Sequence, residues 1–254
     1  MALDSLRQRF AEEIRRAVGV RSDALIRAFG DVPRERFVGP GPWLIDSQGG
    51  YRATPDDDPA HLYADVRVAL DPDRDLNHGR PYVHARWIDQ LAPAAGEHIV
   101  HVGAGTGYYS SILARIVGPR GRIIAIECDA DMAAQLRVNI ADLPQVKVIE
   151  ASAVEVDLGP TDGIYVNAGL TQPQTIWLDR LRIAGRMILP LAETGPNRFG
   201  AVLWVRKLRD GFEARFLDST PDLRIYPCRD GRSQTEEIRL ARAFARGGHQ
   251  DVRS

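Results

Sequence analysis

Three glycines at alternate positions have the spacing that chemistry most often requires. Gly103, Gly105 and Gly107 follow an apolar stretch at residues 99–102 and precede a helical pattern at residues 108–117. Glycine adopts backbone torsions that other residues resist, and it lets a ligand approach the backbone closely. The helix that follows presents unpaired amide groups, which favour an anionic group at its N-terminus. The order of strand, glycine turn and helix therefore predicts a cofactor-binding loop.

The spacing of these glycines distinguishes between cofactors. The dinucleotide pattern G-x-G-x-x-G places its third glycine one residue later, at the position of Tyr108. The spacing G-x-G-x-G is that of S-adenosylmethionine (SAM) sites, where the turn faces the amino-acid part of the cofactor. Glu127 ends the next strand, twenty residues after Gly107, where a carboxylate can accept both ribose hydroxyls. These features favour SAM, with S-adenosylhomocysteine (SAH) as product, over NAD. The alternatives are glycines that only form a turn and a solvated Glu127.

The carboxyl ends of neighbouring strands supply further candidate contacts, because open α/β sheets bind ligands beyond these ends. Ser152 follows the third strand and can hydrogen-bond the adenine amine, with an ordinary turn residue as the alternative. Asn167 ends the fourth strand, with a turn cap as the alternative, and His101 lies in mid-strand, with a satisfied buried histidine as the alternative. The expected cofactor-binding residues are His84, His101, Val102, Gly103, Ala104, Gly105, Thr106, Gly107, Tyr108, Glu127, Cys128, Ser152, Ala153, Asn167 and Gln234.

Alternating helix and strand patterns from residue 82 onward must position these side chains. Such an alternation predicts a mostly parallel sheet that helices cover on both faces. Asp210 and Gly211 form a turn signal between two strand patterns, so an antiparallel hairpin is expected at the edge. The expected helices span residues 83–93, 106–118, 130–143 and 175–185, and the expected strands span residues 97–103, 121–129, 146–152, 162–169, 185–192, 199–208 and 212–219.

The two ends of the chain differ from this core. Apolar residues four apart between Leu6 and Val18 predict an amphipathic helix, and Ser22 can cap a second one. Residues 45–75 are rich in Asp, Pro and Gly and predict a structureless stretch, either a surface insertion or a lid. Residues 233–247 form an amphipathic pattern with a capping box, which predicts a docking or dimer helix.

Composition excludes several classes of protein. The 254 residues include 33 basic and 34 acidic side chains, which gives a net charge of −1 and argues against binding nucleic acid through phosphates. The sequence has no apolar run of about eighteen residues and no signal-peptide pattern, so no membrane association is expected. Two cysteines are too few for a disulfide framework, and the histidines lack metal-ligand spacing. We expect a cytoplasmic monomer or homodimer without a metal.

Several short segments occur in a characteristic order along most of the chain. The first is VPRERFV at residues 32–38, followed by the Y-x-D pattern of Tyr63 and Asp65. Pro81 and His84 are similar to the Pro and the second His of a segment written TISxPHMHA, which belongs to the same set of patterns. Their shared order over residues 5–235 resembles the protein-L-isoaspartate O-methyltransferase family. The other matches are G-x-G-x-G-Y at residues 103–109, G-R-L-V-I-P at Gly185, Arg186 and Pro190, and P-L-T-D…Q at Pro227, Cys228, Arg229, Asp230 and Gln234.

The resemblance implies a class I methyltransferase fold. Its parts are a Rossmann-like seven-stranded α/β sheet, a C-terminal antiparallel β-hairpin and an N-terminal helical lid. It also implies SAM-dependent transfer of a methyl group to a protein or peptide carboxylate. A single domain over residues 1–254 would hold a lid and acceptor loop at 1–90, a SAM-binding core at 91–218 and a C-terminal extension at 219–254.

The chain departs from the family pattern on the acceptor side. The family's serine, two residues before the Pro, corresponds to Gly79, so the hydroxyl that serves the isoaspartyl substrate is absent. His101 stands in place of a glutamate, Ser152 in place of an aspartate, and residues 45–62 are longer than usual. Two alternatives therefore stay open. One is a methyltransferase with a different peptide, small-molecule or RNA-base acceptor, and the other is a SAM-binding adaptor without isoaspartyl activity.

The loop before Pro81 holds the expected catalytic residues His78, Gly79 and Arg80. Methyl transfer depends mainly on aligning the nucleophile with the methyl group. A carboxylate is ionised at neutral pH and needs no base, whereas another acceptor would use one, and histidine is the usual choice. His78 is therefore a candidate base or acceptor contact, and Arg80 a candidate partner for a substrate carboxylate. The alternatives are a solvent-facing histidine and a solvated arginine.

Overall fold

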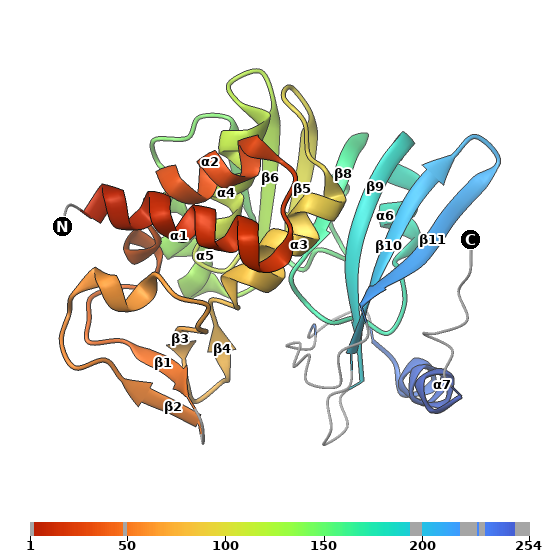
Figure 1. Ribbon diagram of the computed structural model, residues 1–254. Coiled ribbons are helices and arrows are strands. Elements are labelled where there is room, and N and C mark those ends of the chain that lie inside the picture. Colours follow the sequence, from red (N-terminus) through yellow and green to blue (C-terminus); the bar gives the residue numbers. More distant parts are fainter. Residues whose placement is uncertain (1–2, 48–49, 194–199, 219–227, 229–231, 247–254) are drawn as a thin grey trace.

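A seven-stranded sheet runs through the centre of the molecule (Figure 1). The structure is a computed structural model that describes residues 3–47, 50–193, 200–218, 228 and 232–246. The strand order is β11-β10-β9-β8-β5-β6-β7, with β5 to β9 parallel and the last two strands antiparallel to their neighbours. The strands are β5 (His98–Val102), β6 (Arg122–Glu127), β7 (Val146–Glu150), β8 (Thr161–Val166), β9 (Leu181–Ala192), β10 (Gly200–Leu208) and β11 (Gly211–Asp218).

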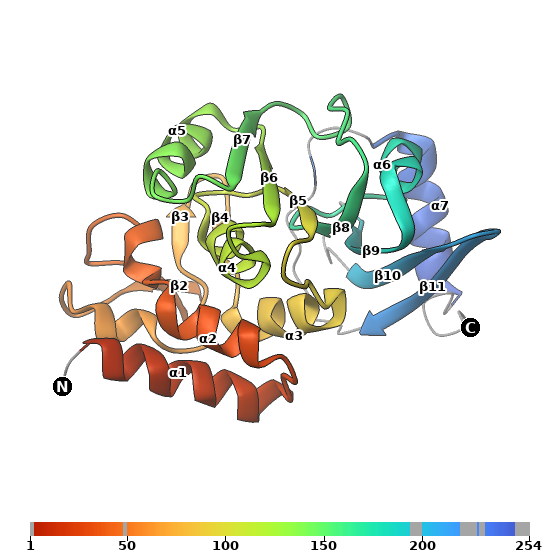
Figure 2. The ribbon, with the colours of Figure 1, turned by 90° about the horizontal axis from the view of Figure 1, so that it is seen from above.

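Helices cover both faces of this sheet, as the near-continuous apolar strands predict. Successive residues of a strand point to opposite faces, so Ile99 and Tyr165 pack with α1 to α4, while Val100 and Ile164 pack with α6 and α7. Figure 2 shows these two sets of helices on opposite sides. The predicted Rossmann-like fold is confirmed. The helices are α1 (Leu3–Val18), α2 (Asp23–Asp31), α3 (Pro81–Leu91), α4 (Tyr108–Val117), α5 (Ala130–Asn139), α6 (Thr175–Arg180) and α7 (Gln234–Ala245).

The two N-terminal helices form an outer layer over α3 and α4 (Figure 2). Ser22 caps α2, as predicted, by accepting a hydrogen bond from the Leu25 amide at 3.2 Å. The Ser22 amide in turn donates to the carboxylate of Asp89 on α3 at 2.9 Å. Phe10 and Phe29 are buried between the layers. This layer belongs to the same hydrophobic core as the sheet.

The prediction of a structureless stretch at residues 45–75 is wrong. Trp43, Leu62 and Val68 form a small core of their own beneath it, which the polar composition of the segment concealed. This segment lies at the lower left of Figure 1, beside the N-terminal helices. Its elements are β1 (Leu44–Ser47), β2 (Gly50–Ala53), the 3-10 turn η2 (Pro59–Leu62), β3 (Ala69–Asp71) and β4 (Leu76–Asn77), with a second 3-10 turn η1 (Arg34–Phe37) just before it.

The predicted helix at residues 175–185 is wrong in its second half. The helix ends at Arg180, and β9 begins at Leu181, which is buried and pairs with Thr161 of β8. A register shift follows, and Gly185 lies in it so tightly that a Cβ would be 2.8 Å from the Arg182 carbonyl oxygen. Gly185, which in the sequence resembles the end of a helix, instead lies in an irregular part of β9 where a side chain would not fit.

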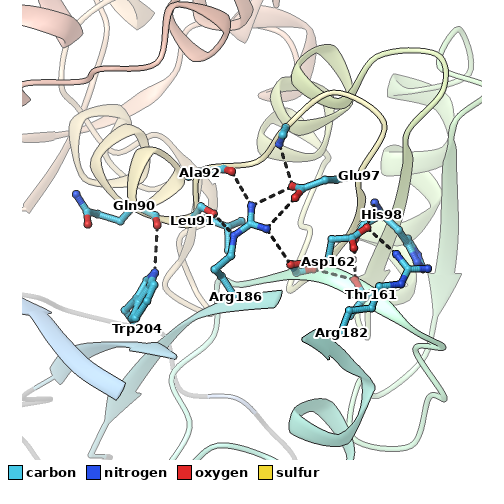
Figure 3. Close-up of polar contacts among 12 residues, drawn as sticks. Gln90, Leu91, Ala92, Glu97, His98, Thr161, Asp162, Arg182, Arg186 and Trp204 are labelled. Atoms are coloured by element: carbon cyan, nitrogen blue, oxygen red, sulfur yellow. Dashed lines mark hydrogen bonds and ion pairs between the residues drawn. The ribbon is translucent and has the colours of Figure 1, made fainter. Parts of the chain in front are cut away.

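Arg186 joins the end of α3 to the amino-terminal edge of the sheet (Figure 3). Its guanidinium donates to the carbonyl oxygens of Leu91 at 3.0 Å and Ala92 at 2.6 Å, where the helix leaves its last carbonyls unpaired. It also forms a two-pronged ion pair with Glu97, at 2.8 Å and 3.0 Å. One side chain thus caps a helix and neutralises a half-buried carboxylate.

Replacing Arg186 with methionine is expected to lower the free energy of unfolding by about 3 kcal/mol, because Glu97 and two carbonyls lose their donor in a half-buried place. Arg182 is the matched control on the same strand. Its ion pair with Asp162 is half-exposed, so Arg182→Met should cost less than about 1 kcal/mol. Urea unfolding of both variants measures the difference. Equal midpoints would show that the Arg186 contacts contribute nothing.

The C-terminal elements match their predictions where the structure describes them. Residues 209–210 connect β10 to β11 in the expected hairpin. Ser233 and Glu236 form a complete capping box at α7, and Leu240 packs against the sheet. Pro227, Arg229 and Asp230 lie outside the described residues. Within the part described, no helix has both the length and the apolar character needed to cross a bilayer.

Candidate functional site

The glycine loop between β5 and α4 has the left-handed torsions expected of it. Gly103, Gly105 and Gly107 have φ values of +70°, +54° and +101°. At Gly107 a Cβ would lie 2.4 Å from the Leu136 side chain of α5, so a larger residue would have to displace that side chain. Around Gly105 no atom lies within 4 Å of such a position. The loop is therefore open at its middle glycine, where a ligand can approach the backbone.

Glu127 lies at the carboxyl end of β6 with its carboxylate held against this loop. One carboxylate oxygen accepts from the Gly105 amide at 2.7 Å, and the other accepts from the Asp129 amide at 3.0 Å. The side chain is buried. The alternative of a solvated strand end is therefore wrong. Each carboxylate oxygen keeps a lone pair with which it can accept a further hydrogen bond, for example from a hydroxyl group.

His101 is a buried histidine whose two nitrogens both have protein partners. The Asn167 side-chain amide donates to Nε2 at 2.8 Å, so the ring proton is on Nδ1, which donates to Ser110 Oγ at 2.7 Å. Burial lowers the pKa of His101 to about 3, so the ring is neutral. Asn167 Oδ1 is buried without a hydrogen-bond partner in the described residues. Through His101, Asn167 is oriented at the carboxyl end of β8 beside Gly103.

His78 does not face solvent, contrary to the alternative considered for it. The ring is buried against Tyr108 and Tyr109, with centroid distances of 5.0 Å and 5.9 Å. Arg34 Nε donates to His78 Nδ1 at 3.5 Å. Burial and, secondly, the Arg34 charge lower the pKa of His78 well below its usual value. His78 is therefore neutral, with its proton on Nε2.

Arg80 already has carboxylate partners from the protein. Its guanidinium is 2.6 Å from Asp46 of β1 and 3.6 Å from Asp65. The Asp65 carboxylate also accepts from the Tyr82 amide at 2.9 Å and so caps α3. Arg80 thus links the loop before Pro81 (residues 78–80, the acceptor loop) to the β1–β2 hairpin. A substrate carboxylate would have to compete with Asp46 for Arg80.

Arg34 is a fully buried arginine of the VPRERFV segment and was not among the expected site residues. Its guanidinium donates to the carbonyl oxygens of Leu62 and Val66, each at 2.7 Å, and of Ala64 at 3.2 Å and Gly79 at 3.3 Å. The hydroxyl of Tyr63 accepts from the Arg34 amide and donates to Glu35. The VPRERFV and Y-x-D segments therefore hold the acceptor loop in place.

A second connection reaches the carboxyl end of β6 from residues 45–75. Arg74, between β3 and β4, forms an ion pair with Asp129, whose carboxylate also caps α5 at the Met132 amide. A cavity of about 330 Å³ lies next to it, lined by Val38, Gly39, Leu70, Asp71, Arg74, Asp131, Met132 and Gln135. Residues 45–75 thus reach the corner of the sheet that carries Glu127.

The other expected cofactor residues have varied surroundings. Thr106 is buried and donates to the Phe37 carbonyl at 2.6 Å, and Tyr108 packs beneath the loop against Phe29 and Phe37. Among the described residues no three His, Cys, Asp or Glu side chains form a metal site. Val102, Ala104 and Ala153 are buried, Ser152 is half-buried, and Cys128 and Gln234 are exposed.

A family model and individual relatives among known proteins all relate this chain to the same family. The family model described as protein-L-isoaspartate(D-aspartate) O-methyltransferase matches residues 6–213. A relative from Methylorubrum populi with the name protein-L-isoaspartate O-methyltransferase is 31% identical over 81% of this chain and 96% of its own. Another, from Rhodopseudomonas palustris, is 27% identical over 81% and 89%.

Solved structures agree on the fold. One named protein-L-isoaspartate O-methyltransferase superposes with a TM-score of 0.72 at 21% identity, over 87% of this chain and 65% of that chain. A structure from Plasmodium falciparum that carries the same family name, in complex with SAH, has a TM-score of 0.69 at 18% identity, over 88% and 98%.

Proposed function

The chain belongs to the protein-L-isoaspartate O-methyltransferase family, and we propose that it methylates the free carboxylate of isoaspartyl residues in proteins or peptides, with SAM as methyl donor. The observation that carries the proposal is the Glu127 carboxylate held against the open glycine loop at Gly105. Family membership supports the proposed reaction, and this geometry supports the proposed cofactor site.

The residues present fit SAM. Glu127 offers two carboxylate oxygens to the ribose hydroxyls, and the loop at Gly105 leaves room for close approach to the backbone. The start of α4 directs amide groups toward a carboxylate. Asn167 Oδ1 offers an unused acceptor at the carboxyl end of β8. When bound, SAM supplies an electrophilic methyl group.

The acceptor side fits a carboxylate nucleophile. A carboxylate attacks in its ionised form, so the protein has to orient it and exclude water and needs no base. His78 and His84 both have pKa values below the usual value, with burial as the main cause in each. Neutral imidazoles of low basicity are poor proton acceptors and good N–H donors. Such donors suit an anionic acceptor better than a hydroxyl or an amine that must lose a proton.

Two measurements test the proposed function. Calorimetry with SAH should show binding, and radiolabelled SAM should methylate a peptide that contains isoaspartate but not the same peptide with aspartate. Binding of SAH without methylation of any isoaspartyl peptide would favour another acceptor or an adaptor. Absence of SAH binding would refute the cofactor assignment itself.

Replacing Glu127 with alanine is expected to weaken SAH binding roughly 100-fold, because two hydrogen bonds to a charged acceptor are lost. Glu150 is the matched control, since it ends β7 directly beside Glu127 but is exposed and paired with Arg137 at 2.9 Å. Glu150→Ala should bind SAH as the wild type does. Calorimetry of both variants measures the effect, and an unchanged affinity of Glu127→Ala would contradict the ribose role.

A further inference from the structure

The strand β11 forms one edge of the seven-stranded sheet and pairs on one side. Within the described residues its partner is β10, and Figure 1 shows β11 as the outermost strand at the right of the sheet. The open side of an edge strand presents backbone amides and carbonyls that can pair with a further strand. Edge strands are often protected by lysine or proline, and residues 211–218 contain neither. The composition of β11 therefore leaves this side open to another strand.

The sequence of β11 is complementary to its own reverse. Its centre is the run Phe-Glu-Ala-Arg-Phe at residues 212–216, in which a carboxylate and a guanidinium flank Ala214 symmetrically. When two copies of this strand pair antiparallel about Ala214, Glu213 of each copy lies opposite Arg215 of the other. Each Phe212 lies opposite a Phe216 in the same way. Directly opposite side chains have Cβ atoms about 5 Å apart, so these pairs attract one another.

The two faces of β11 separate the apolar pairs from the charged pairs. Ala214 and Phe216 pack on the side of the sheet that α6 and α7 cover. Because side chains alternate between the faces of a strand, Phe212 shares that face, and Glu213 and Arg215 lie together on the other. An antiparallel copy thus places apolar side chains against apolar ones on one face and opposite charges together on the other face.

The side chains along this edge are available to a partner. Phe212 is 44% exposed. Glu213 is half-buried, and within the described part of the chain its carboxylate has no hydrogen bond or ion pair. Arg215 lies over the Trp204 ring and donates to the Gln90 side chain at 2.9 Å, which holds the guanidinium at the edge of the sheet. Its remaining N–H groups can donate to a carboxylate.

Other registers of β11 against itself satisfy these charges less well. A shift of the antiparallel pairing by two residues places Glu213 opposite Glu213, or Arg215 opposite Arg215, and like charges repel. A shift by one residue places each charge opposite an apolar side chain. A parallel copy in register sets identical charges side by side. The antiparallel register about Ala214 is therefore the favoured one.

We propose that β11 is a dimer interface, and that its occupant is β11 of a second copy of this chain in the antiparallel register about Ala214. The contact has two-fold symmetry, so the pair of Glu213 and Arg215 occurs twice. The two sheets join into one continuous sheet, in which β8, β9 and β10 separate the interface from the glycine loop of each copy. The inference goes beyond the proposed function and does not depend on it.

Sedimentation velocity over a wide range of protein concentration tests this interface. The wild type should sediment as a dimer when concentrated and as a monomer of 28.1 kDa when diluted. Arg215→Glu places carboxylates opposite carboxylates, and Glu213→Arg places guanidinium groups opposite guanidinium groups. Each single variant should therefore raise the dissociation constant of the dimer roughly 100-fold.

Two combinations of these substitutions should restore the dimer. The double variant Glu213→Arg, Arg215→Glu has the charges exchanged and is again complementary to itself. An equimolar mixture of the two single variants should form a heterodimer, because each Arg of one variant then faces a Glu of the other. A variant that had merely lost its fold would not regain association on mixing, and circular dichroism confirms that each single variant is folded.

Lys147→Glu is the matched control. Lys147 is exposed on β7, the opposite edge of the same sheet, and its reversal changes the net charge as much as Arg215→Glu does. It should leave the dissociation constant unchanged. The inference is overturned if the wild type is a monomer at every concentration, if Arg215→Glu has no effect, if the mixture forms no dimer, or if Lys147→Glu dissociates the dimer. Because mass alone is measured, failure of SAH binding or of methylation does not affect this result.

Discussion

Replacing Arg34 with methionine is expected to lower the free energy of unfolding by about 4 kcal/mol, the range for breaking a buried charged network. The guanidinium is fully buried and supplies the hydrogen bonds that four carbonyl oxygens and His78 Nδ1 accept. Methionine fills part of the volume but donates nothing. Arg34→Lys should recover only part of the loss, because an ammonium group lacks the planar fork that reaches these oxygens together.

Arg36 is the control for this experiment. It lies in the same 3-10 turn, but it is exposed and forms an ion pair with Asp142 at 2.7 Å. Arg36→Met should change the free energy of unfolding by about 1 kcal/mol or less. Urea unfolding followed by circular dichroism gives both values. If the two variants lose equal stability, the buried network does not hold the acceptor loop together.

Acid is expected to destabilise the protein steeply below pH 6.5. Burial lowers the pKa of His84 and of His101 to about 3, and that of His78 also lies well below 6.5. Below pH 6.5 the histidines of the unfolded chain bind protons, whereas the same histidines in the folded protein do not. The free energy of unfolding therefore rises with pH in this range and falls as the pH decreases toward 4. Each histidine contributes about 1.4 kcal/mol per pH unit. The two histidines with a pKa of about 3 remove about 4 kcal/mol by pH 5, and His78 acts in the same direction, against a total of roughly 5–15 kcal/mol for a domain.

Urea titrations at several pH values between 5 and 7.5 measure this effect. His101→Asn should reduce the slope of stability against pH by about a third, since one of the three titrating rings is gone. His61→Gln is the control, because His61 lies outside this cluster and pairs with Asp56. The expectation fails if the wild type has the same midpoint at pH 5 and pH 7.

Local patterns predicted the sheet and the conformation of the glycine loop well. The parallel strands are short apolar runs, and glycine is the residue type that most readily adopts the left-handed torsions found at residues 103, 105 and 107. Glu127 could be located because strand length and the strand order of this fold place its carboxylate at the loop. Structural features that depend on spacing along the chain, such as the position of Glu127 relative to the glycine loop, could therefore be predicted from the sequence.

Contacts between distant segments could not be read in the same way. His78 lies in a polar loop, yet it is buried against Tyr108 and Tyr109 and accepts a hydrogen bond from Arg34, which is 44 residues away. Arg80 is paired because the β1–β2 hairpin brings Asp46 to it, and that hairpin was expected to be structureless. At residue 181 the pairing of Leu181 with β8 outweighed a helical pattern that continued to Gly185. In each case tertiary contacts, and not local propensity, decided the structure.

The buried charge of Arg34 has an electrostatic consequence for turnover. Its described partners are carbonyl oxygens and an imidazole nitrogen, all uncharged, so its positive potential extends into the acceptor loop and lowers the pKa values of His78 and His84. In a low-dielectric interior such a potential attracts an anionic carboxylate strongly. A methyl ester carries no charge and loses that attraction. Under the proposed reaction, one buried cation therefore favours substrate capture and, after methylation, product release.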